Sequence, residues 1–237
     1  MKNAILIIYG LFLCFGLVAQ NNEPIRIKAG TRVIDSVPFA ERYQYPGFTK
    51  GKITLNDGRS NFCMFNLNLL SGEMEFLQGK DTLFIAEKKE ISKIVIAKDT
   101  FLYHDNYLRL IKGGKLKIYM NQRFAIVDVL KKGAMGTINR TAASESYDYF
   151  NSTSNSYNLK VDQEIVLKKT ANFYFSLNEK DFMLFNNKNI SKIVPDKNGI
   201  IKEYLKTNDI DFRSATDILK LGDFLKPLLN EKTAKSK

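Results

Sequence analysis

The sequence predicts an α+β fold that is mainly β, an antiparallel meander sheet or roll with a C-terminal helical cap. Three observations predict it. Between residues 31 and 130, turn residues interrupt short apolar or alternating runs about every eight to twelve positions, which is typical of antiparallel strands. No segment of helical pattern, such as parallel strands need for their crossovers, separates these runs. Beyond residue 178 the spacing of the apolar residues becomes helical.

Glycines mark the expected turns of the sheet. Asp57-Gly58 separates GKITL from NFCMFNLNLL, and an Asp-Gly pair accepts the positive φ that a tight hairpin turn requires. Gly72, Gly79 and Gly113-Gly114 interrupt the runs that follow. KLKIYMNQRFAIVDVL comes after the last of these turns, and YNLKVDQEIVLKK and ANFYFSL predict two further strands.

The C-terminal quarter is expected to be a short helical cap on the sheet. Apolar residues recur at roughly helical spacing over 182–193, and Pro195 ends that element. Asn198-Gly199 predicts a turn before the next apolar run. Ser214 and Asp217 have the spacing of a capping box at the start of ATDILKLGDFLKPLL.

Residues 1–19 have the pattern of a secretory signal peptide. Lys2 precedes an apolar run over 4–18, and Ala19 is a small residue suited to cleavage. A membrane anchor is the alternative, but this run is shorter than the roughly 20 residues that cross a bilayer. Lipidation of Cys14 is a second alternative, which its apolar neighbours disfavour. We therefore expect cleavage after Ala19 and a location in the periplasm or at the outer-membrane periphery.

Removal of the signal peptide leaves Cys63 as a single cysteine, so the mature chain has no internal disulfide and depends on its core. The expected organisation is a signal peptide over 1–19, an antiparallel β domain over 20–177 with a flexible loop at 131–156, a helical segment over 178–230 packed on the sheet, and a disordered tail over 231–237.

The segment 131–156 is rich in Gly, Ser, Thr, Asn and Tyr and keeps no hydrophobic period. An irregular segment of this length is unusual inside a domain, so it is either a disordered excursion or a partner-binding loop. Wholly solvated loops seldom carry so many aromatic residues, which favours partner binding. The candidate partner-binding residues in and beside the loop are Tyr147, Tyr149, Phe150 and Tyr157.

The charge of the chain is strongly positive, with 36 Lys and Arg against 25 Asp and Glu. A solvated basic surface is the simplest explanation, and an anionic partner surface is the sharper one. Nucleic acid is not expected as a partner, because export separates the protein from it and no Arg-rich stripe or stacking-aromatic motif is present.

Glu73 and Glu75 are the candidate acidic pair of a hydrolase. Strand spacing puts their Cα atoms about 6.5–7 Å apart, which is compatible with the carboxyl pair of a glycosidase. In a strand, however, Met74 and Phe76 would face the core and both glutamates would face water. We therefore interpret the pair as the solvated side of an ordinary strand.

Other catalytic constellations are absent from the sequence. His104 is the one histidine, and no CxxC, HExxH, phosphate-binding or nucleophile-elbow motif occurs. No catalytic residue, cofactor or metal ion is therefore expected.

Several stretches together resemble a group of exported, β-rich proteins of the Bacteroidota. They are a leader ending in VAQ, TKGKITLNDGRSNFCMFNLNLLSGEMEFL, KKGAMGT and KNGIIKEYLKTNDIDFRSATDILKL. The resemblance rests on turn glycines and core positions, so it carries over no catalytic residue. It implies a periplasmic or outer-membrane address, in cells whose import and type 9 secretion assemblies have small periplasmic subunits, one of which plugs the translocon pore.

The leading hypothesis is a non-enzymatic exported protein that docks on an envelope protein, as an accessory or plug subunit of an outer-membrane transport or secretion assembly. One alternative is a periplasmic enzyme acting on envelope glycans through Glu73, Glu75, Asp81 or His104. A second alternative is a lipid or small-ligand carrier whose curved sheet encloses a cavity. The oligomeric state is left open.

Overall fold

The computed structural model describes residues 23–132, 138–142 and 160–234, and over these residues the chain is mainly antiparallel β-sheet with a C-terminal helical segment. This confirms the predicted fold class. The strands are β1 (Ile25–Ile27), β2 (Thr49–Leu55), β3 (Ser60–Asn68), β4 (Glu73–Gln78), β5 (Asp81–Phe84), β6 (Ile91–Ile96), β7 (Asp99–His104), β8 (Asn106–Lys112), β9 (Lys117–Lys132), β10 (Ile138–Ala142), β11 (Glu164–Ser176) and β12 (Met183–Leu184).

The helices are few, and most of them follow the last strand. Their bounds are α1 (Val33–Ser36), α2 (Phe39–Arg42), α3 (Asn187–Ile190), α4 (Asn198–Thr207) and α5 (Ala215–Ala234), with short 3₁₀ turns η1 (Lys88–Glu90) and η5 (Pro195–Lys197). No helix in the described part of the chain is long and apolar enough to cross a membrane.

All strands belong to one open sheet with the order β1-β11-β9-β8-β7-β6-β2-β3-β4-β5, to which β10 adds beside β9 and β12 beside β11. Two meanders make up most of it: β2 to β5, and β6 to β9. The chain returns after β5 to place β6 on the other side of β2, so β2 lies between β3 and β6. The predicted hairpin at Asp57-Gly58 is confirmed, with Gly58 at φ 88°.

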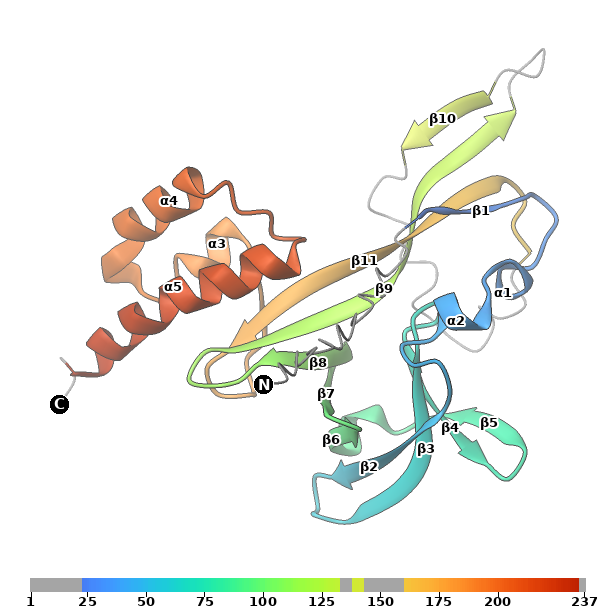
Figure 1. Ribbon diagram of the computed structural model, residues 1–237, viewed down its shortest axis with the longest axis horizontal. Coiled ribbons are helices and arrows are strands. Elements are labelled where there is room, and N and C mark those ends of the chain that lie inside the picture. Colours follow the sequence, from blue (N-terminus) through green and yellow to red (C-terminus); the bar gives the residue numbers. More distant parts are fainter. Residues whose placement is uncertain (1–22, 133–137, 143–159, 235–237) are drawn as a thin grey trace, which may run out of the picture.

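The longest element is the β9–β11 pair, which runs diagonally through the molecule (Figure 1). YNLKVDQEIVLKK and ANFYFSL do not form the two separate strands predicted from them. Instead β11 runs unbroken from Glu164 to Ser176, because no turn residue separates the two segments. A register shift between Val166 and Leu167 accommodates one extra residue on β9, Val127, whose side chain is exposed.

One face of β11 supplies both hydrophobic cores. Alternate residues of a strand share a face, so the odd-numbered residues of β11 point the same way. Ile165 and Leu167 lie in the core of the curved sheet, whereas Phe173 and Phe175 lie in a second core under the C-terminal helices. Lys169 stands between the two cores on this face.

Lys169 is nearly buried, with 6% of its side chain exposed. Its Nζ lies 2.6 Å from Oε2 of Glu41 in α2 and 5.7 Å from the ring centroid of Phe124. A lysine is rarely buried unless its charge is paired, and Glu41 supplies that partner.

The C-terminal helices cover the other end of the β9–β11 pair (Figure 1). Apolar side chains of α5 pack there against Ile118 and Phe175. The fit is close at Gly222, where a Cβ atom would lie 2.4 Å from Cδ1 of Ile118. The second core consists chiefly of Leu116, Ile118, Phe173, Phe175, Phe185, Ile190, Ile193, Ile201, Ile218, Leu221 and Leu225.

Several predicted boundaries in this segment differ from the structure. The helical period predicted from 182 is interrupted by β12, and Asn198-Gly199 begins α4 instead of forming a turn. Residues 231–234, predicted as part of a disordered tail, belong to α5. The cap at Ser214 is confirmed, because its Oγ accepts the Asp217 backbone N–H at 3.3 Å.

Position 51 of β2 requires glycine, because the neighbouring strands β3 and β6 leave no room for a side chain there. A Cβ atom there would lie 2.7 Å from the carbonyl oxygen of Val95 and 2.9 Å from Cδ2 of Phe65. We expect Gly51→Ala to lower the free energy of unfolding by about 1–3 kcal/mol, because backbone must move to make room. Urea denaturation measures this, with Gly199→Ala as the control, since a Cβ atom there meets nothing within 4 Å. Equal stability of the two variants would contradict the close packing.

Candidate functional site

The four aromatic residues predicted to bind a partner, Tyr147, Tyr149, Phe150 and Tyr157, lie outside the described residues, as do residues 1–19. Part of the predicted loop 131–156 is described, and it is not irregular. Residues 131–132 complete β9, and 138–142 form β10, which pairs with β9 from Ile138 opposite Lys132. These residues therefore belong to strands, where the sequence predicted no regular structure.

Glu75 does not face water as predicted. It is only 3% exposed, whereas Met74 beside it is in the core as expected. Oε2 of Glu75 accepts the hydroxyl of Tyr43 at 2.6 Å, and Oε1 accepts Nδ2 of Asn68 at 2.9 Å. The alternation rule fails here because Tyr43 belongs to a segment before β2 that pairs with the end of β3 and covers the glutamate.

The burial of Glu75 changes its acid strength. Loss of water raises the pKa of the carboxyl group, and this outweighs the hydrogen bonds from Tyr43 and Asn68 and the charge of Arg42, which lower it. The pKa of Tyr43 is also raised, first by burial and then by the nearby carboxylate of Glu75. Both groups lie inside the fold, so the pair holds the segment before β2 on the sheet.

Glu73 is half-buried and has different neighbours. It forms an ion pair with Lys88 of η1, which also lies over the ring of Tyr103. Burial, and then the charge of Glu73, raise the pKa of Tyr107. The Tyr107 hydroxyl and Oε2 of Glu73 are both buried, and neither has a hydrogen-bond partner within the described part of the chain.

The remaining candidates of the enzyme hypothesis, Asp81 and His104, lie on other strands. Asp81 is exposed at the start of β5, at the edge of the sheet. His104 is at the end of β7, with its ring 4.9 Å from that of Phe182 and its Nε2 4.0 Å from Asp105. In the sheet order, strands β6, β2 and β3 lie between β7, which carries His104, and β4, which carries Glu75.

The feature that sequence reasoning missed is the edge of the sheet at β5, beside which no further strand lies among the described residues. This strand pairs with β4 on one side, is the last strand of the sheet order, and all four of its residues are exposed. Figure 1 shows the β4–β5 hairpin standing out from the body. Leu83 and Phe84 are 40% and 49% exposed, which is unusual for apolar side chains on an edge strand.

The backbone at this edge offers hydrogen-bonding groups to solvent. Ile85 donates its N–H to the carbonyl of Met74 on β4. This hydrogen bond shows which residues along β5 direct their backbone groups toward β4 and which direct them away from it. Groups alternate inward and outward along such a strand, so Thr82 and Phe84 direct their N–H and C=O groups away from β4. These groups form a template for one more strand.

An apolar groove lies beside the edge. It has a volume of about 390 Å³ and is lined by Ile53, Asn61, Cys63, Phe65, Phe76, Phe84, Ile85 and Ala86. Cys63 is partly buried and forms part of this lining.

A second exposed aromatic lies on β3. Phe62 is 64% exposed, and the ammonium groups of Lys50 and Lys52 lie 5.7 and 5.9 Å from its ring centroid. Met64, two residues along the same face, is 40% exposed. An apolar surface fringed by lysines can contact both apolar and anionic groups.

Among the described residues, no group of three or more His, Cys, Asp and Glu side chains is arranged to hold a metal ion. No protein-family model, curated protein or solved structure matches the chain.

The raised pKa of Glu75 predicts a pH dependence of stability. Folding favours the protonated carboxyl, so this stabilisation is complete below the unfolded-state pKa of about 4.3 and is lost as pH rises through the folded-state pKa. Glu75→Gln removes the titration while its amide can still bond with Tyr43 and Asn68. The Tm of Glu75→Gln minus the Tm of wild type should increase by about 2–4 °C from about pH 4 to about pH 8, because only the wild type loses stability over this range. This change in Tm corresponds to ~1 kcal/mol of unfolding free energy.

Thermal melting followed by circular dichroism measures this difference. The exposed Glu87→Gln is the control and should run parallel to wild type. If the difference between Glu75→Gln and wild type stays constant with pH, the carboxyl does not titrate as described.

Proposed function

We propose that this chain is a non-enzymatic exported protein that docks on a protein of the cell envelope, and that it binds an extended segment of that partner at the free edge of β5. An accessory or plug subunit of an outer-membrane transport or secretion assembly is the role that we infer. The observation that carries the proposal is the exposed edge strand with Leu83 and Phe84 beside an apolar groove.

Strand addition explains why these features occur together. An added strand would satisfy the outward N–H and C=O groups of Thr82 and Phe84, which gives affinity independent of sequence. Its alternate side chains would point toward the groove lined by Phe65 and Phe76, which gives specificity. Both features would otherwise be liabilities, because an uncovered apolar edge promotes aggregation.

The basic character of the chain adds to this proposal. Lys50 and Lys52 stand around Phe62 on β3, two strands from β5 in the sheet order. Positive charge of this kind speeds encounter with an anionic envelope surface, whereas the edge supplies the specific contact. Glu75 is buried and hydrogen-bonded to Tyr43 and Asn68 inside the fold, which adds no support to the alternative of an enzyme acting on glycans.

A photo-crosslinking residue at position 83 tests the docking edge in cells that produce the protein. We expect a crosslink to one discrete envelope protein from Leu83, and none from Leu177, an exposed leucine (45%) at the far end of β11. Equal yields from the two positions, or none from either, would contradict docking at β5.

The role of the backbone is tested by Thr82→Pro in the crosslinking protein. Proline removes an outward N–H and is tolerated on an edge strand, so the fold should be retained while strand addition is blocked. Loss of this hydrogen bond should reduce the crosslink about tenfold. Thr82→Val keeps the N–H and is the matched control. A Pro variant that folds and still crosslinks like the Val variant would show that the partner does not bind as a strand.

A further inference from the structure

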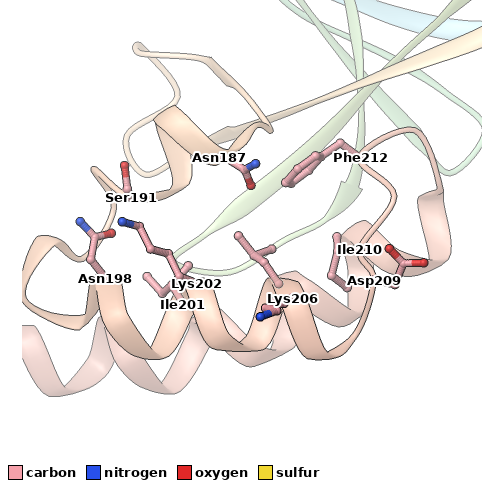
Figure 2. A pocket seen from close by; sticks show the side chains of 10 residues that line it. Asn187, Ser191, Asn198, Ile201, Lys202, Lys206, Asp209, Ile210 and Phe212 are labelled. Carbon is pink, nitrogen blue, oxygen red and sulfur yellow. The ribbon is translucent and has the colours of Figure 1, made fainter.

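A separate pocket lies in the C-terminal segment, between α3 and α4 and the turn that follows α4. Its volume is about 380 Å³, within the range of small-molecule sites. The buried Ile201 anchors α4 to the second core, and Asp209 turns the chain back at a φ of 44°. This turn places Ile210 and Phe212 at the pocket wall (Figure 2).

The two ends of the pocket differ in chemistry. Figure 2 shows Ser191, Asn198 and Lys202 together at one end, and Ile210 and Phe212 at the other, where Asn187 and Asp209 also lie. A molecule that fills the pocket would therefore have its polar group near Lys202 and its apolar part against Phe212.

Lys202 gives the polar end a positive charge, and Lys206 lies between the two ends of the pocket (Figure 2). Lys202 and Lys206 both line the pocket, and neither forms an ion pair with a carboxylate in the part of the chain that the structure describes. Asp209 also lines the pocket, but Figure 2 places it at the end with Phe212, away from Lys202. An anion is favoured at the Lys202 end and disfavoured at the opposite end.

The amide of Asn198 adds a second observation at the same end. Its Oδ1 is buried and has no hydrogen-bond partner among the described residues. A buried polar atom without a partner is costly. A half-turn of the amide would exchange the oxygen for the NH₂ group, which can donate to an anion held by Lys202.

We propose that this pocket binds a small amphipathic carboxylate, with the carboxylate between Lys202 and Asn198 and a short hydrocarbon tail against Ile210 and Phe212. The site is independent of the β5 edge and of the proposed docking function. It also differs from the carrier hypothesis drawn from the sequence, in which the curved sheet enclosed the ligand, because here the helical segment forms the pocket.

Titration of the isotope-labelled mature protein with sodium decanoate, followed by NMR, tests the proposal. We expect saturable shifts at the backbone amides of Ser191, Asn198 and Phe212. Decanol has the same tail without the charge and should bind about tenfold more weakly.

Variants locate the head group. Lys202→Met removes the charge at nearly constant length and should weaken decanoate binding about tenfold, with a smaller effect expected for Lys206→Met. Lys188→Met is the matched control, because Lys188 is an exposed lysine of α3 that does not line the pocket. No saturable binding, equal affinity for decanol, or equal losses in Lys202→Met and Lys188→Met would each overturn the proposal.

Discussion

The β9–β11 pairing is the constraint on which the rest of the fold depends. One face of β11 contributes Ile165 and Leu167 to the core of the curved sheet, and Phe173 and Phe175 to the core under the helices. The two cores are therefore joined through a continuous strand, not through a linker. A slip of one residue in this register would turn apolar side chains of both cores toward water at once, which fixes the register strongly.

Sequence patterns correctly predicted the parts of the fold that depend on residues close together in the chain. Asp57-Gly58 specifies a hairpin through its own backbone preference, and Ser214 caps α5 through a contact three residues away. Predictions failed where distant segments decide the outcome. Glu75 is buried because Tyr43, 32 residues earlier in the chain, packs over it. The alternation of apolar and polar residues within β4 cannot predict a contact with so distant a segment. Strand β10 was not predicted, because it forms through its pairing with β9.

The candidate sites show the same division. A sequence can identify TLFIA as a strand, but it cannot reveal that β5 ends the sheet, because edge position is a property of the whole strand order. Likewise, the α3–α4 pocket needs Lys202 on one helix and Phe212 beyond the following turn to face a common space. Neither surface contains a motif. Each becomes visible only when exposed apolar groups and hydrogen-bonding or charged groups are seen together.

The position of β1 has a consequence for the order in which the molecule is completed. Ile25 pairs with Leu167, about 140 residues later, and β11 is the one strand with which β1 pairs among those described. During synthesis, β1 therefore stays without this strand partner until most of the chain has been made. Closing so long a loop is slow compared with forming the hairpins, so β1 is expected to be among the last strands to join.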